Sequence, residues 1–162
     1  MSRQFTDTAG HTWTLKLDVW TVKRVRDMAG VDLLDLGDAE APPKEQLLFK
    51  LVADPVLLVD VLYVILKPAA EAAGVSDEDF GRAMAGDTID QATKALLGEI
   101  ADFIPNPRDR ARARKVIAGT WELIDKAQDL LDQRVDVELP KIIAEAVAIL
   151  GNSSTSSPGE SG

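Results

Sequence analysis

The most apolar stretch of the chain lies between Asp54 and Leu66 and reads DPVLLVDVLYVIL. Asp54 followed by Pro55 is typical of a helix start, because an Asp side chain can accept from free N–H groups there and Pro fits the first turn. From Val56 to Leu66 apolar residues occur nearly all round the helix, interrupted only by Asp60. Such a helix is expected to be buried, and at this length it is too short to span a bilayer, which needs roughly 20 residues. We therefore predict a helical fold built around this central segment.

Further helices are predicted on both sides of the central segment. Asp18 is placed to cap a helix over 19–29, with Trp20, Val25 and Met28 on one side of it. The remaining helical patterns cover 44–53, 76–85, 89–104, 108–135 and 139–150. In the longest of these patterns one apolar stripe is expected, formed by Ile117, Trp121, Ile124 and Leu131.

The first residues alternate as a strand does. Trp13, Leu15 and Leu17 share one face, and the stretch 7–10 before them has turn chemistry. We predict a β-hairpin over about residues 4–18, with Phe5 and Trp13 covering a helix. Because an isolated hairpin is marginal in water, it must pack on the rest of the chain.

The fold class is thus mainly α, a multi-helix bundle with a small N-terminal β-hairpin and a disordered C-terminal tail. We expect one helical domain over 1–150. Residues 151–162 are Gly, Asn, Ser, Thr, Pro and Glu with no large apolar side chain. Such a composition cannot offset the entropy of ordering, so this segment is predicted to be a disordered tail.

The composition restricts the possible functions. The 162 residues carry a formal net charge of −9 and no Cys. A negative surface repels phosphate backbones and anionic lipid, so general nucleic-acid or membrane binding is not expected. The lack of Cys excludes disulfides, thiolate metal ligands and a Cys nucleophile. The first ten residues lack the apolar core of a signal peptide, so a cytoplasmic protein is expected.

No catalytic constellation is evident in the sequence. His11 is the single histidine and sits beside the predicted hairpin turn, without a nucleophile and an orienting acid near it in the sequence. Asp32, Asp35 and Asp38 do not have the ligand spacing of a calcium loop. There is no Gly-rich phosphate loop. We therefore expect no catalytic residues, no cofactor, no metal and no enzymatic activity.

One segment is strongly basic. Five positive side chains lie within eight residues: Arg108, Arg110, Arg112, Arg114 and Lys115. On a helix they are expected to spread around the cylinder without forming a clean stripe. Three interpretations are open at this point, namely pairing with nearby acidic residues, binding of an acidic protein partner, and contact with nucleic acid. These five residues are the candidate partner-binding site.

Three blocks of sequence carry a family resemblance. The first joins Phe5-Thr6-Asp7, Gly10 and Trp13 to the segments 22–26 (VKRVR) and 31–36 (VDLLDL). The second is DPVLLVDVLY over 54–63, and the third is FGRAMAGDTI over 80–89, leading to ADFIP over 101–105. Between Phe5 and Leu131 the chain resembles the small helical tail assembly chaperones of tailed phages and prophages.

The resemblance implies a protein that binds the long, aggregation-prone tape measure protein before the tail tube polymerises around it. The tail tube protein is a second candidate partner. The resemblance also implies action in the host bacterial cytoplasm and absence from the mature virion. Many proteins of this family exist in a short form and a longer frameshifted form, and the segment from Gly151 resembles a linker suited to such a junction. The oligomeric state is left open.

A second function stays open beside this one. The chain could be a small helical regulatory or adaptor protein that contacts nucleic acid through the basic patch 108–115. A very long gene immediately downstream that encodes a helical protein would favour the chaperone function.

Overall fold

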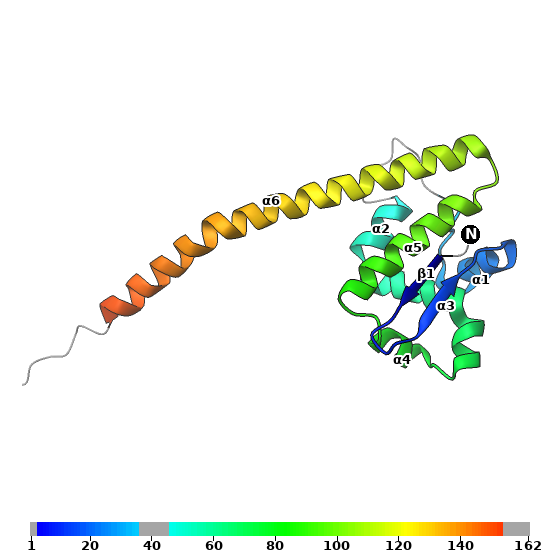
Figure 1. Ribbon diagram of the computed structural model, residues 1–162, viewed down its shortest axis with the longest axis horizontal. Helices are drawn as coiled ribbons and strands as arrows, with labels where there is room; N and C mark the ends of the chain where they lie inside the picture. The colour runs from blue at the N-terminus through cyan, green and yellow to red at the C-terminus, as the bar shows by residue number, and fades with distance from the viewer. Residues whose placement is uncertain (1–2, 36–45, 154–162) are drawn as a thin grey trace, which may run out of the picture. The chain divides into compact units, whose positions relative to one another are not determined.

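The computed structural model describes residues 3–35 and 46–153, and for residues 152 and 153 it describes the backbone alone. The chain forms two compact units, Met1–Ala118 and Gly119–Gly162. The predicted fold class is confirmed, since a two-stranded antiparallel hairpin is followed by helices. In chain order the elements, drawn in Figure 1, are β1 Arg3–Thr6, β2 Thr12–Leu15, α1 Val19–Ala29, α2 Leu47–Ala53, α3 Pro55–Ala73, α4 Asp77–Arg82, α5 Asp87–Phe103 and α6 Pro107–Ser153.

The hairpin packs on helices through one face, as its alternation predicts. Phe5 pairs with Trp13 across the two strands, and both side chains are buried. The Trp13 ring meets the ring of Phe80 from α4 edge to face, with centroids 5.5 Å apart. Gly10 takes a left-handed φ of 91° in the turn, which only glycine adopts without strain. The hairpin is therefore part of the core of the first unit, with β1 along α5 and β2 against α3.

Helix α3 supplies the centre of that core. Asp54 Oδ1 accepts from the N–H groups of Val56 and Leu57, at 3.0 and 3.2 Å, so the predicted cap is present. The side chains that α3 buries are Leu58, Val61, Leu62, Val64, Ile65, Leu66 and Ala70. Val56 and Asp60 are exposed, so the helix is buried on most sides but has one edge in solvent.

A proline lies inside α3. Pro68 has no N–H, so the carbonyl of Val64, one turn earlier, loses its usual helical donor. Arg24 from α1 replaces that donor, since its Nε donates to Val64 O at 3.0 Å and its Nη2 donates to Ile65 O at 2.9 Å. The guanidinium therefore satisfies partly buried backbone carbonyls near the proline and joins α1 to α3.

Helix α1 differs from its predicted orientation. Asp18 caps it through Thr21 N at 2.7 Å and Gly30 ends it in a left-handed conformation, as expected. Trp20 is 66% exposed and Met28 is 53% exposed whereas Val25 is buried, so the prediction that the three share one side of the helix is wrong. Trp20 and Val25 are five positions apart, which at 3.6 residues per turn places them on different sides of the helix. The buried side is instead formed by Thr21, Val22 and Val25.

The shorter helices agree with the predictions except at their ends. Helix α2 begins at Leu47, and residues 44 and 45 of the predicted helix lie outside the described residues. Ser76 caps α4 as expected, but the helix ends at Arg82 and not at Ala85. Gly86, with φ of 57°, immediately precedes α5.

The two helices predicted over 108–135 and 139–150 are one helix, and Pro140 lies inside it. Pro140 has no N–H, so the carbonyl of Asp136, one turn earlier, loses its helical hydrogen-bond donor. Asp136 is exposed, and water can donate to this carbonyl instead. The helix therefore need not break there. It also continues through Gly151 to Ser153, so the predicted start of the tail at 151 is wrong, and the rest of the predicted tail, 154–162, lies outside the described residues.

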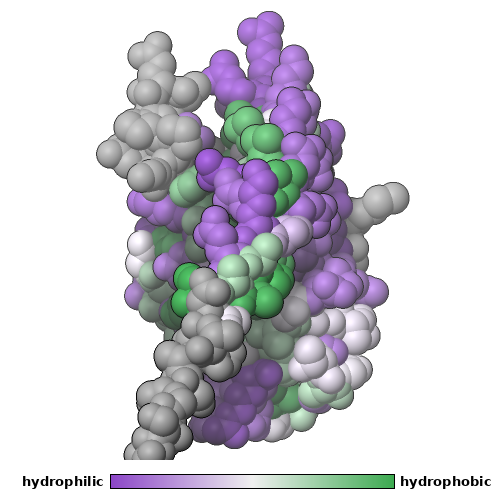
Figure 2. Space-filling model, turned by 90° about the vertical axis from the view of Figure 1, so that its left-hand side faces the viewer, coloured by the Kyte–Doolittle hydropathy of each residue, from purple (hydrophilic) through white to green (hydrophobic). Residues whose placement is uncertain are grey.

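Hydrophilic residues dominate the face seen in Figure 2, and hydrophobic residues show between them as smaller groups. Among the described residues, no helix combines the length and the hydropathy needed to cross a membrane.

Replacing the buried Leu62 tests the core. Leu62 is fully buried in the middle of α3. We expect Leu62→Ala to lower the free energy of unfolding by about 2–5 kcal/mol, through lost burial and the cavity left behind. Chemical denaturation measures this change. A loss under about 0.5 kcal/mol would contradict the burial of α3.

A double-mutant cycle tests the contact at the proline. We expect Arg24→Leu to lower the free energy of unfolding by about 1–3 kcal/mol, because the Val64 carbonyl is left without a donor. In a Pro68→Ala background the alanine N–H supplies that donor, so the same change should cost about 1 kcal/mol less. The exposed Arg26 on the same helix is the control, and Arg26→Leu should show no dependence on residue 68. Equal costs of Arg24→Leu in both backgrounds would contradict the assigned role.

Candidate functional site

The basic residues of the candidate partner-binding site lie at the start of α6, inside the first unit. This part of the helix packs through the buried Ala113, which contacts Ala101 and Ile104 at the end of α5, with Ile117 partly buried beside them. The packing fixes which side of the helix faces the body. The five basic residues are divided between the two sides.

Arg110 and Arg114 point toward the body and are used by it. Arg110 donates through Nε to Ile104 O at 3.0 Å and through Nη2 to Pro105 O at 3.3 Å, which satisfies carbonyls at the α5–α6 turn. Arg114 donates to Asp102 Oδ1 at 2.7 Å. For these two residues the interpretation of structural pairing fits the geometry.

Arg108, Arg112 and Lys115 lie on the other side and are exposed. Their positions are i, i+4 and i+7, so they form one stripe along the helix, and the expectation that the basic residues make no clean stripe is wrong for these three. Within the part of the chain that the structure describes, none of the three side chains makes an ion pair. Positive charge near a helix N-terminus opposes the macrodipole. Helix stability therefore does not account for this basic stripe.

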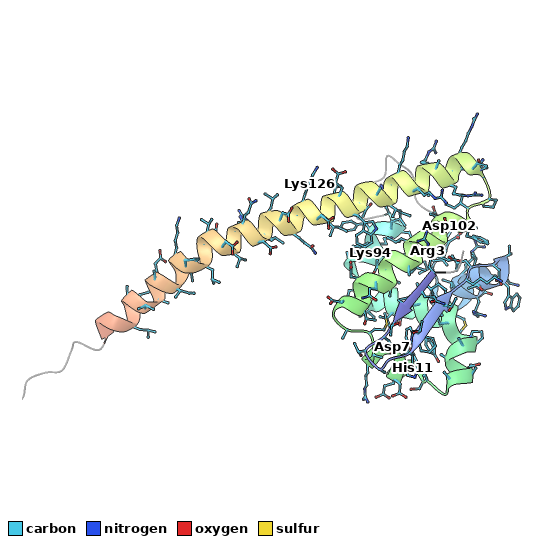
Figure 3. All side chains as sticks on the ribbon, in the orientation of Figure 1. Arg3, Asp7, His11, Lys94, Asp102 and Lys126 are labelled. Carbon is cyan, nitrogen blue, oxygen red and sulfur yellow. The ribbon has the colours of Figure 1, made fainter. Side chains whose placement is uncertain are left out.

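Asp102 joins three elements of the first unit. Its carboxylate accepts from Arg3 of β1 at 3.1 Å and from Arg114 of α6 at 2.7 Å, and Figure 3 shows Arg3 and Asp102 together at one end of the hairpin. The Arg114 hydrogen bond, followed by that of Arg3, holds the pKa of Asp102 below its usual value, although burial acts in the opposite direction. Gly98 leaves room for this arrangement, because a side chain there would collide with Arg3.

A second polar cluster lies at the opposite end of the hairpin, where Figure 3 labels Asp7 and His11. The buried Asp7 accepts from Trp13 Nε1 at 2.8 Å and from the backbone N–H groups of Ala9 and His11 at 3.0 and 2.9 Å. Burial alone would raise the pKa of Asp7, but these hydrogen bonds and the nearby His11 outweigh it, so the pKa is lowered. His11 Nδ1 lies 3.3 Å from the same carboxylate. The cluster therefore satisfies the polar groups of a buried turn.

The longest exposed apolar surface belongs to the part of α6 in the second unit. Its large hydrophobic side chains are mostly more than half exposed, as far as this unit is described. They are Leu123, Leu130, Leu131, Val135, Val137, Leu139, Ile142, Ile143, Val147, Ile149 and Leu150. Sequence periodicity identified Leu131 as part of a stripe, but it could not show that Leu131 and its neighbours are exposed.

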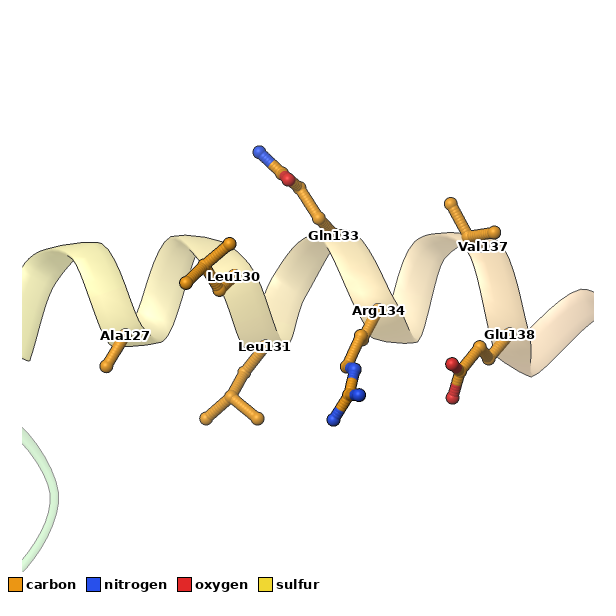
Figure 4. Close-up of a pocket in the computed structure, with 7 residues that line it drawn as sticks. All are labelled: Ala127, Leu130, Leu131, Gln133, Arg134, Val137 and Glu138. Carbon is orange, nitrogen blue, oxygen red and sulfur yellow. The ribbon is translucent and has the colours of Figure 1, made fainter.

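A shallow hollow on this helix offers no enclosed site. All seven residues that line it project from the same helix, as Figure 4 shows. They are Ala127, Leu130, Leu131, Gln133, Arg134, Val137 and Glu138. A ligand pocket surrounds most of a small molecule, and one helix cannot do so. This surface is suited to a second helix rather than to a small ligand. Among the residues described, no three His, Cys, Asp or Glu side chains are grouped to hold a metal.

The Asp102 contacts predict a change in acid stability. Because the pKa of Asp102 is lower in the folded chain, its stabilisation is present above the unfolded pKa of about 3.9 and is lost as the pH falls toward the folded value. We expect Asp102→Asn to cost about 1 kcal/mol at pH 7 and progressively less below about pH 4. Urea denaturation across this pH range checks it. A deficit that stays constant with pH would contradict the ionic role of Asp102.

Comparisons with protein-family models, with curated proteins and with solved structures find no match to this chain.

Proposed function

We propose that this protein is a non-enzymatic tail assembly chaperone of a tailed phage or prophage, and that it binds the tape measure protein before the tail tube forms. The observation that carries the proposal is the exposed apolar surface of α6 beyond residue 119. The sequence blocks that resemble the chaperone family, between Phe5 and Leu131, supply the identity of the client. The proposed place of action is the bacterial cytoplasm, without incorporation into the virion.

In the proposed mechanism, apolar contact between the client and α6 replaces apolar contact between client molecules. Monomeric proteins rarely expose large contiguous apolar surface, and where they do it marks an interaction site. An isolated helix is marginal in water unless an apolar face packs against something. A long client that exposes helical apolar surface would otherwise self-associate, and helix-on-helix docking covers both surfaces. The tail tube protein is a second candidate client for the same surface.

The outward basic stripe favours a second candidate function. Arg108, Arg112 and Lys115 form a row of positive charge that no described acidic residue neutralises. Such a row suits an acidic protein or a nucleic-acid backbone, as in a small regulatory or adaptor protein. The net charge of −9 opposes general binding to nucleic acid. Binding of duplex DNA that weakens steeply with salt and is lost in Arg112→Glu would favour this alternative.

Co-expression tests the chaperone proposal. We expect the chain to raise the soluble fraction of the tape measure protein encoded beside it several-fold, and to elute with it in size exclusion. Leu131→Ser/Ile142→Ser, on the exposed part of α6, should abolish the effect because it removes apolar contact area.

Val56→Ser/Trp20→Ser is the matched control. Both residues are exposed and apolar, but they lie on α3 and α1 in the first unit. This variant should solubilise the client as well as the wild type does. If the wild-type chain leaves the client insoluble and no complex forms, the proposal is wrong. If both variants lose the effect equally, α6 is not the binding surface.

A further inference from the structure

An acidic row runs along one flank of the exposed apolar stripe of α6. The apolar stripe consists of Ile124, which is partly buried, and of the exposed Leu131, Val135, Leu139, Ile142 and Ile149, and these residues recur at helical spacing. The acidic row, called here the acid edge, consists of Glu122, Asp125, Asp129, Asp132 and Asp136. In sequence an acid follows directly after Ile124, Leu131 and Val135, so the acid edge lies immediately beside the stripe.

The acid edge is unfavourable for the helix by itself. Its members are three or four residues apart, which makes them neighbours on the helix surface, and like charges at this spacing repel. Asp is also a poor residue for a helix interior. Glu122 pairs with Lys126 at 3.1 Å, but within the described part of the chain the four aspartates form no ion pair. An external positive charge would relieve this repulsion.

Two copies that pack stripe against stripe do not supply that charge. The flank opposite the acid edge is mixed in charge, since it carries Arg134 and Lys141 together with Glu138 and Glu145. If two copies of the stripe pack antiparallel, acid edge meets acid edge. If they pack parallel and in register, Arg134 and Lys141 lie opposite Leu139 and Ala146 of the other copy and not opposite its aspartates. Packing of stripe against stripe therefore leaves the acid edge uncompensated in both of these arrangements.

We propose that the apolar stripe and the acid edge together bind an amphipathic helix that carries Lys or Arg along one flank. The inference rests on the proposed function, in that it names the chemistry of the client segment recognised by α6. The stripe from Ile124 to Ile149 is about 38 Å long, which accommodates a client helix of roughly 25 residues. Apolar contact supplies the affinity, and the acid edge selects basic over acidic helices and fixes the orientation of the client.

Three labelled peptides of about 25 residues test the inference with the full-length chain. All three share one leucine stripe and differ along a single flank, which is lysine, glutamine or glutamate. We expect the lysine peptide to bind about tenfold more tightly than the glutamine peptide in fluorescence anisotropy at low salt, and the glutamate peptide to bind least. Raising the salt to about 0.5 M should remove most of the difference.

Two charge-matched variants locate the effect. Asp129→Asn/Asp132→Asn removes two charges from the acid edge, and Glu138→Gln/Glu145→Gln removes two from the opposite side of the stripe. We expect the first to weaken binding of the lysine peptide about fivefold, and the second by less than about twofold. Circular dichroism checks that both variants keep their helix content.

The alternative results each overturn the inference. Equal weakening by both variants would show a general effect of net charge, and equal binding of the lysine and glutamine peptides would show apolar contact alone. A concentration-dependent dimer that excludes all three peptides would show that a second copy occupies the stripe. Failure of the proposed function is distinguishable. If the wild-type chain binds the lysine peptide but leaves the tape measure protein insoluble, the acid edge remains a binding surface for basic helices. The tape measure protein is then not its client.

Discussion

The guanidinium of Arg24 holds the centre of the first unit together, because it donates to the carbonyls that surround a proline in a buried helix. Pro68 would ordinarily leave Val64 O, a partly buried carbonyl, without a helical donor. Arg24 satisfies Val64 and the following carbonyl at once. A long, charged side chain from α1 is thereby fixed on α3, and the orientation of α1 follows from that contact. This explains why Thr21, Val22 and Val25 face inward while Trp20 remains in solvent.

The hairpin is held by a similar principle at both of its ends. At the turn, Asp7 accepts from the Trp13 indole and from two backbone N–H groups, so a buried carboxylate has donors around it. At the other end, Arg3 reaches over Gly98 to Asp102, which also holds Arg114. Two strands of four residues each could not stay folded alone. Their stability comes from the apolar face around Phe5 and from these polar contacts at the ends.

Sequence reasoning succeeded where a local signal had one physical meaning. The Asp54-Pro55 start of α3, the Asp18 and Ser76 caps and the alternation around Trp13 each specify a local structure that tertiary packing did not override. It failed where the outcome depends on what lies opposite. Trp20 is large and apolar, but only the position of α3 decides which side of α1 is buried. Pro140 has the same chemistry as Pro68. How each helix tolerates its proline depends on whether water can reach the carbonyl that loses its hydrogen-bond donor, and this accessibility cannot be read from the sequence.

The same limit applies to the basic patch and explains its double character. All five positive residues look alike in the sequence, but the packing of Ala113 turns Arg110 and Arg114 toward the body. Those two side chains therefore hold the α5–α6 turn, and their loss would act through stability. Arg108, Arg112 and Lys115 are left on the outer side, where their charge opposes the helix macrodipole. Beyond residue 119 the helix shows a comparable conflict, with aspartates side by side along an exposed apolar stripe. Both arrangements cost the isolated chain some stability, and this is the pattern expected of surfaces whose charges are compensated only when a partner is bound.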